Sequence, residues 1–125
     1  MRIAIPIWEN KLSPVLDTAS RLMIVEEVDG SESSRFEIYM DEEDLSRRCV
    51  RIQGIGVDTL ICGAVSRPFL RMLRASGITI IPEIAGQVDD VLRAYFQGTL
   101  LHSGFLMPGC RRHGSRGGRA GLKKD

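Results

Sequence analysis

Two short apolar segments constrain the fold of this chain more than any other feature of its sequence. Residues 59–62 read Thr-Leu-Ile-Cys, and residues 78–81 read Ile-Thr-Ile-Ile. Short, mostly apolar runs bounded by turn formers are typical of strands buried on both faces of a sheet. Each run is followed by a turn and a helical pattern, and such alternation favours parallel strands joined by right-handed connections. The sequence therefore predicts an α/β domain.

The N-terminal part of the chain predicts three further strands. Residues 2–7 form the first strand, and residues 21–28 and 35–40 form the next two. Asp29-Gly30 is a strong turn signal between the second and third strands, so these two pair as an antiparallel hairpin. Together with the two apolar runs, they give a five-stranded mixed sheet.

A polar segment separates the first two strands. Residues 9–20 contain several turn formers and no apolar alternation, so we expect a long loop. Loops of this length in a small domain are often functional.

Three helices are expected, and each has start and stop signals of its own. Acidic residues suit a helix start, serine caps a helix, and glycine ends one. The helices are expected after Asp41–Asp44 as far as Gly54, from Ser66 to Gly77, and over residues 87–97 as far as Gly98. The order of elements, β-β-β-α-β-α-β-α, predicts helices on both faces of a mixed sheet.

The composition indicates one globular domain. The chain has 125 residues, of which 43% are hydrophobic and 26% are charged. No stretch approaches the roughly 20 apolar residues of a membrane span, and the N-terminus lacks the pattern of a signal peptide. Three cysteines are too few and too odd in number for a disulfide framework. We therefore expect a cytoplasmic protein.

The C-terminal residues differ in charge from the rest of the chain. Residues 111–125 carry six basic side chains and one acidic side chain, although the net charge of the whole chain is only +1. We expect a domain over residues 1–104 and a basic, disordered tail over residues 105–125. A polyanion or a protein partner could bind this tail. Nucleic acid is an unfavourable partner, because the tail after residue 107 has no aromatic residue for base stacking.

Three blocks of sequence resemble a known family. They are Ile3–Pro6 with Leu12–Pro14, Asp17–Ala19 and Leu22–Val25; then Gly56–Gly63; then Ser76–Ile78 with Gly86–Leu92, Tyr95 and Gly98–Leu100. In order and spacing they resemble the dinitrogenase iron–molybdenum cofactor biosynthesis domain over residues 1–102. This resemblance implies a ribonuclease H-like fold with strand order 3-2-1-4-5 and an antiparallel second strand.

The resemblance also implies a function. Members of this family are described as small carriers of iron–molybdenum cofactor or related metal–sulfur clusters, often without detectable catalysis. We therefore expect a non-catalytic carrier, accessory to cofactor assembly, that binds a metal–sulfur cluster or another small anion and could have a protein partner. An interaction module that uses the basic tail is the alternative.

The expected ligand site is a crevice beyond the carboxyl ends of the first and fourth strands. The chain leaves these neighbouring strands in opposite directions, which opens such a crevice. Gly63 and Gly86 would allow close backbone approach, N–H groups at two helix starts would face an anion, and Arg67 would add a positive charge. The candidate residues are Trp8, Asn10, Ser13, Pro14, Val15, Asp17, Gly63, Ala64, Val65, Ser66, Arg67, Ala85, Gly86 and Gln87.

Two positions differ from the pattern of the family. Many members have a histidine where this chain has Val15, and a glycine-rich loop where this chain has residues 64–67. Both differences weaken direct ligation of a metal by these loops.

Several of the candidates have an alternative structural interpretation. Cys110 and His113, with His102 as a third ligand, could bind a metal, or they could be incidental residues of a tail. Trp8 could line the crevice or cover the sheet edge, and Asp17 could bind ligand or cap a turn. Cys49 and Cys62 are better explained as core residues than as ligands.

The sequence does not favour an enzyme. Two-metal nucleases need carboxylates that converge on the sheet, whereas the strand carboxylates Glu26, Glu27 and Glu37 lie on outward positions. We also find no nucleophile–base pair, no P-loop and no zinc-protease motif.

Overall fold

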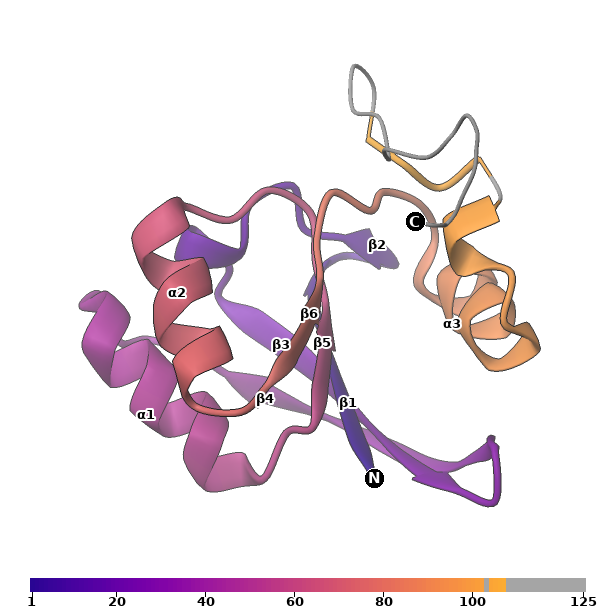
Figure 1. The fold of residues 1–125 in the computed structure, drawn as a ribbon, viewed down its shortest axis with the longest axis horizontal. Coiled ribbons are helices and arrows are strands. Elements are labelled where there is room, and N and C mark those ends of the chain that lie inside the picture. Colours follow the sequence, from indigo (N-terminus) through magenta and orange to yellow (C-terminus); the bar gives the residue numbers. More distant parts are fainter. Residues whose placement is uncertain (103, 108–125) are drawn as a thin grey trace.

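A computed structural model describes residues 1–102 and 104–107 of the chain (Figure 1). The strands are β1 (Arg2–Trp8), β2 (Lys11–Leu12), β3 (Arg21–Val28), β4 (Ser31–Tyr39), β5 (Thr59–Ile61) and β6 (Thr79–Ile81). The helices are α1 (Leu45–Ile55), α2 (Arg67–Ala75) and α3 (Val88–Gln97), with short 3-10 turns η1 (Leu16–Thr18) and η2 (Leu100–His102).

The strands form one mixed sheet in the order β4-β3-β1-β5-β6, with β2 paired to β1 outside this path. β3 is antiparallel to both β1 and β4, whereas β5 is parallel to β1 and to β6. The expected mixed sheet is therefore present, and the five predicted strands lie in the predicted order. The predicted number of five strands is wrong, because the described sheet has six.

The additional strand is β2, which lies inside the segment that we predicted to be a loop. Glu9 and Asn10 form a two-residue turn, after which Lys11 pairs with Trp8 and Leu12 with Ile7. Glu9 takes a left-handed conformation with φ 57°, which is uncommon for a glutamate. A strand of two residues shows no alternation, and this turn contains no glycine, so the sequence carried no hairpin signal.

The two faces of the sheet form two hydrophobic cores. Side chains alternate along β1, so Ala4 packs beneath α1 and α2 whereas Ile3 and Ile5 pack beneath α3. Figure 1 shows α1 and α2 on one side of the strands and α3 on the other. This arrangement confirms the predicted helices on both faces.

The helix ends follow capping chemistry, with one correction. Asp44 caps α1 by accepting a hydrogen bond from the N–H of Arg47 (3.2 Å). The helix continues through Gly54 and ends at Gly56, which has φ 84°. The predicted stop at Gly54 is therefore wrong, because Gly56 is the glycine that adopts the left-handed conformation of a C-terminal cap.

Residues 104–107 pack against the body of the domain. Leu106 forms a bridge with Ile84, and the N–H of Met107 donates to the carbonyl oxygen of Glu83 (2.8 Å). The predicted boundary after residue 104 falls just before this contact, and the division itself stays a prediction. Our predictions for Cys110, His113 and the rest of the tail after residue 107 lie outside the described residues. No helix in the described part of the chain is long and apolar enough to span a membrane.

Candidate functional site

Three loops meet at the carboxyl ends of the parallel strands, and we call residues 8–17, 63–67 and 84–87 together the loop cluster. Ala64 joins the first two loops, because its N–H donates to Pro14 (2.8 Å) and its carbonyl oxygen accepts from Leu16 (2.9 Å). The N–H of Leu12 donates to the carbonyl oxygen of Gly86 (3.0 Å), which joins the first and third loops. The sequence therefore predicted correctly that these three segments come together.

The two glycines of the loop cluster lie against the chain itself. A Cβ atom at Gly63 would lie 2.5 Å from the carbonyl oxygen of Pro14 and 2.9 Å from that of Ser13. A Cβ atom at Gly86 would lie 2.9 Å from the ring of Phe105. A neighbouring segment of the chain therefore fills the space beside each glycine. We predicted that a ligand would approach the backbone there.

One half of the loop cluster surrounds the start of α2, and we call Val15, Asp17 and residues 64–67 the α2 side. The carboxylate of Asp17 accepts a hydrogen bond from the N–H of Ser66 (2.9 Å), so Asp17 holds η1 against the start of α2. The hydroxyl of Ser66 in turn accepts from the N–H of Phe69 (3.4 Å) and caps α2 as predicted. Arg67 is exposed.

Some hydrogen-bond donors of the α2 side remain available. Within residues 1–102 and 104–107, the N–H groups of Val65 and Arg67 have no hydrogen-bond acceptor. Arg67 also forms no ion pair within the described part of the chain. The α2 side therefore presents free N–H groups beside an exposed guanidinium, which is a favourable environment for an anion.

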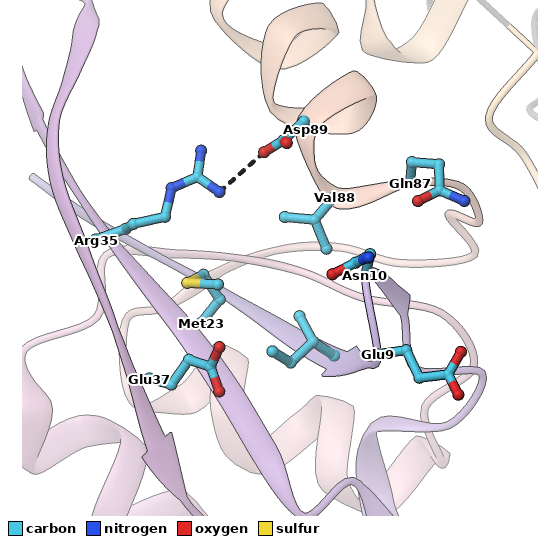
Figure 2. A pocket seen from close by; sticks show the side chains of 9 residues that line it. Glu9, Asn10, Met23, Arg35, Glu37, Gln87, Val88 and Asp89 are labelled. Atoms are coloured by element: carbon cyan, nitrogen blue, oxygen red, sulfur yellow. Dashed lines mark hydrogen bonds and ion pairs between the residues drawn. The ribbon is translucent and has the colours of Figure 1, made fainter.

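The other half of the loop cluster borders a cavity of about 290 Å³, which we call the α3-side cavity. Its walls come from β1, β3, β4, the β1–β2 turn and the start of α3 (Figure 2). The lining residues are Ile7, Glu9, Asn10, Met23, Arg35, Glu37, Gln87, Val88 and Asp89. Only Asn10 and Gln87 of these were predicted as site residues.

Carboxylates outnumber cations around the α3-side cavity. Arg35 is the one cation among its lining residues, and its guanidinium binds Asp89 (2.9 Å) and Glu32 (2.6 Å). Figure 2 shows Arg35 reaching from β4 toward Asp89 at the start of α3. The hydrogen bond from Arg35 lowers the pKa of Glu32 below its usual value of 4.5. The positive charge of Arg35 is therefore already neutralised by this chain's own carboxylates.

The charged lining residues that sequence reasoning missed here are Glu9, Arg35, Glu37 and Asp89. Alternation along β4 places Arg35 and Glu37 on one face, and that signal was available. The sequence gives no signal that these residues lie near α3, because their proximity depends on how α3 crosses the sheet.

The described cysteines do not offer metal ligands. Cys49 and Cys62 are both buried, as predicted for core residues. Burial, with a smaller contribution from the carboxylates of Asp17 and Glu83, raises the pKa of the Cys62 thiol to about 12. Since the thiolate is the form that binds a metal, Cys62 is inert at neutral pH. Within the described residues, no three His, Cys, Asp or Glu side chains are grouped to hold a metal ion.

The remaining predicted residues lie around these two halves. Trp8 is 65% exposed at the end of β1, whereas Ser13 is buried and its N–H donates to the carbonyl oxygen of Pro6 (2.8 Å). The N–H of Ala85 donates to the carbonyl oxygen of Phe105 (2.6 Å). The predicted residues are thus neighbours along one edge of the sheet, but they divide between the α2 side and the α3-side cavity.

Comparison with known sequences identifies the family. A family model described as dinitrogenase iron-molybdenum cofactor matches residues 1–98. The chain belongs to this family. The resemblance seen in the sequence blocks is therefore confirmed. A search of curated proteins finds no match.

Solved structures similar to this member of the dinitrogenase iron–molybdenum cofactor family share its fold. A provisionally named dinitrogenase of Methanocaldococcus jannaschii has 22% identity and a TM-score of 0.65, over 78% of this chain and 89% of that one. The apo form of the orange protein of Desulfovibrio gigas has 16% identity and a TM-score of 0.66, over 78% and 88%. A provisionally named NifB protein of Thermotoga has 22% identity and a TM-score of 0.61, over 90% and 98%.

Proposed function

We propose that this chain is a non-catalytic, cytoplasmic carrier of an iron–molybdenum or related metal–sulfur cluster, accessory to cofactor assembly. Membership of the dinitrogenase iron–molybdenum cofactor family supports a role connected with that cofactor. The observation that carries the proposal is the α2 side, where free N–H groups and the exposed Arg67 lie together at the sheet edge.

The expected ribonuclease H-like topology is part of this proposal. The sheet order β4-β3-β1-β5-β6 places β1 and β5 side by side, and their chains continue into different loops. In open α/β sheets, ligands bind outside the carboxyl ends of strands at such a switch point. The loop cluster lies at this position.

The α2 side suits an anionic cluster better than the α3-side cavity does. An anion at the start of α2 would receive the N–H groups of Val65 and Arg67 and the charge of Arg67, beside one carboxylate, Asp17, which is already bound to the N–H of Ser66. An anion in the α3-side cavity would meet Glu9, Glu37 and Asp89, with a single arginine that is already paired. Electrostatic repulsion therefore favours the α2 side.

Binding on the α2 side needs no protein thiolate. The sulfide atoms of a cluster accept hydrogen bonds, and such contacts hold an anion without a direct bond to its metal. A binding mode without thiolates is consistent with Cys62, because burial keeps its thiol protonated. Val15, which is 38% exposed, then contributes an apolar wall and no ligand.

Cys110 and His113 are a second means of holding the cluster in this proposal. Met107 is hydrogen-bonded to Glu83, and the N–H of Glu83 donates to the carbonyl oxygen of Gly63 (2.9 Å). Cys110 follows Met107 by three residues in the sequence. His102 is the third candidate ligand of this set.

The direct test is the metal and acid-labile sulfide content of the full chain purified without oxygen, together with its absorption spectrum. The proposal predicts molybdenum, iron or another metal together with sulfide, close to one cluster per chain. A colourless protein that also fails to take up a metal–sulfide anion such as tetrathiomolybdate would contradict it.

Truncation after residue 107 separates this proposal from the alternative of an interaction module. A cluster held on the α2 side stays bound to residues 1–107, whereas binding of a polyanion by the tail is lost. Cys110→Ser in the full chain tests the second means of holding the cluster. If the metal content is unchanged in this variant, the thiol of Cys110 is not a ligand.

A further inference from the structure

The outer edge of β4 is the longest open strand edge in the described sheet. β4 is the last strand in the sheet order, so no strand of the described residues pairs with its outer side. All its residues except Ile38 are exposed, and Tyr39 is 72% exposed. An open edge carries unpaired N–H and C=O groups that can pair with another chain.

The backbone groups that face outward can be assigned from the pairing with β3. The N–H of Met40 donates to the carbonyl oxygen of Ser20 (2.8 Å), in the same register that pairs Arg21 with Tyr39. Hydrogen-bonded and non-hydrogen-bonded pairs alternate along an antiparallel ladder. The N–H and C=O groups of Phe36 and Ile38 therefore face β3, and those of Arg35 and Glu37 face outward.

The open part of the edge is limited at both ends. A register shift in β3–β4 pairing between Glu26 and Glu27 leaves Ser33 as an extra residue of β4. At the other end, the guanidinium of Arg51 donates to the carbonyl oxygen of Tyr39 (3.0 Å). The regular, uncovered segment is therefore residues 34–38, with Phe36 at its centre.

We propose that this segment is a homodimer interface, in which two copies of the chain pair β4 with β4 antiparallel about a twofold axis at Phe36. In a continuous antiparallel sheet, directly opposite side chains lie on the same face. The twofold axis must therefore pass through the position of one residue, because an axis between two residues would pair side chains from opposite faces. An axis at Phe36 places Arg35 opposite Glu37 of the second copy, twice by symmetry. An axis at Arg35 or Glu37 would place like charges opposite each other, which is unfavourable.

The backbone and side chains both suit this register. Arg35 and Glu37 of the second copy form a hydrogen-bonded pair, since their N–H and C=O groups face outward. Phe36, 41% exposed, meets its own copy at the non-hydrogen-bonded position, where side chains approach more closely. Within one chain Arg35 already binds Glu32 and Asp89, and Glu37 binds Arg21 (3.0 Å), so the contact between copies adds a further partner to side chains that are held in place.

The short segment makes this a weak dimer. Five paired residues from each copy bury less than the roughly 1,200 Å² of a standard interface. The dimer is therefore expected to dissociate on dilution, and it does not depend on the carrier function.

The test is sedimentation equilibrium of the full 125-residue chain, from about 10 μM to about 1 mM, the range in which small interfaces associate. The apparent mass should rise with concentration from 13.9 kDa toward twice that value. Arg35→Glu and Glu37→Arg should each remain monomeric, because each places like charges opposite each other. The double variant, Arg35→Glu with Glu37→Arg, should regain the dimer.

The double variant distinguishes pairing from a change within one chain. Arg35→Glu places a carboxylate beside Glu32 and Asp89, and Glu37→Arg places a guanidinium beside Arg21, the ion-pair partner of Glu37. The double variant keeps both of these repulsions within one chain. Recovery of the dimer therefore reports the contact between copies. Arg93→Glu, the same charge change at an exposed ion pair of α3, is the matched control and should dimerise like the unchanged chain.

Three results would overturn the proposal. One is a monomer at every concentration, which would mean that the charges of β4 only protect its edge. Another is a dimer that both single variants retain, which would place the interface elsewhere. The third is a folded double variant that stays monomeric.

A cross-linking measurement tests the register even if the charge variants fold poorly. In a Cys110→Ser background, Phe36→Cys places the new thiol opposite its own copy, within disulfide range. Ser34→Cys places it opposite Ile38 and should cross-link far less under the same mild oxidation. Equal cross-linking of the two variants would contradict an axis at Phe36.

Discussion

The starts of α2 and α3 share a position in the fold but differ in charge. Each helix follows a parallel strand, and each begins at the loop cluster. α2 begins with a serine cap and Arg67 and has no acidic residue in its first turn. α3 begins without a side-chain cap and has Asp89 and Asp90 in its first turn. The backbone arrangement alone does not make an anion site, because the side chains of the first turn decide which ligand is tolerated.

The two halves are also held together differently. The α2 side depends on close backbone contact at Gly63 and on the partly buried hydrogen bond of Asp17. The α3-side cavity depends on ion pairs of Arg35 with partly exposed carboxylates. Substitutions on the α2 side should therefore affect stability more than substitutions around the cavity.

Gly63→Ala should have the largest effect. The new Cβ atom would meet two backbone carbonyl oxygens that cannot move without displacing the first loop. We expect the free energy of unfolding to fall by at least about 2 kcal/mol, measured by urea denaturation. Gly54→Ala is the control, because nothing lies within 4 Å of its Cβ position in α1, and it should gain about 0.5–1 kcal/mol. Equal stability of the two variants would argue against the close contact at Gly63.

Asp17→Ala should have the next largest effect. It removes the acceptor of the Ser66 N–H at the start of α2. We expect a loss of about 1–2 kcal/mol in the free energy of unfolding, because a hydrogen bond to a charged group is lost. Asp17→Asn keeps an acceptor oxygen and should lose less than half as much. If both variants lose the same amount, the carboxylate charge matters and the hydrogen bond does not.

Glu32 should give the α3-side cavity a pH-dependent contribution to stability. Arg35 lowers the pKa of Glu32 in the folded chain below 4.5, so this carboxylate stabilises the fold above that pH. The contribution is lost as the pH falls through the lowered pKa. Glu32→Gln should therefore reduce the urea midpoint more at neutral pH than at about pH 3.

The control for this measurement is Glu43→Gln, at an exposed carboxylate with no ion pair in the described part of the chain. It should show no such difference between the two pH values. A Glu32→Gln effect that is as large at low pH as at neutral pH would contradict the assignment to the Arg35 ion pair.

Asp89→Asn should have the smallest effect. Its ion pair with Arg35 is exposed on the aspartate side, and such pairs contribute only a few tenths of a kcal/mol. The thermal midpoint should hardly change in 0.15 M salt. A loss above about 1 kcal/mol would show that the cavity is held more firmly than its exposure indicates.

Much of the fold followed from short-range sequence signals. The apolar runs, the Asp29-Gly30 turn and the periodicity of residues 87–97 correctly placed the main strands and helices. The β1–β2 hairpin was missed because Glu9 adopts a left-handed conformation without a glycine to signal it. Gly54 and Gly56 are two residues apart, and only the backbone conformation distinguishes the glycine that ends α1.

The candidate site was harder to predict because it depends on contacts between distant segments. The meeting of the three loops followed from strand order, which a sequence can indicate. The role of Gly63 did not, since it requires knowing that Pro14 lies against it. The pairing of Arg35 with Asp89, 54 residues away, likewise arises only when α3 is packed on the sheet.

The most direct test of the account measures which half of the loop cluster holds the anion. Equilibrium dialysis of tetrathiomolybdate without oxygen should be compared for the unchanged chain, Arg67→Gln and Arg74→Gln. Arg74 lies on the same helix about 10 Å further from its start, which makes it a matched control. The account predicts affinity about tenfold weaker for Arg67→Gln, since a charge-assisted contact is lost, and no change for Arg74→Gln or Asp89→Asn. Unchanged affinity in Arg67→Gln, or a larger effect of Asp89→Asn, would contradict it.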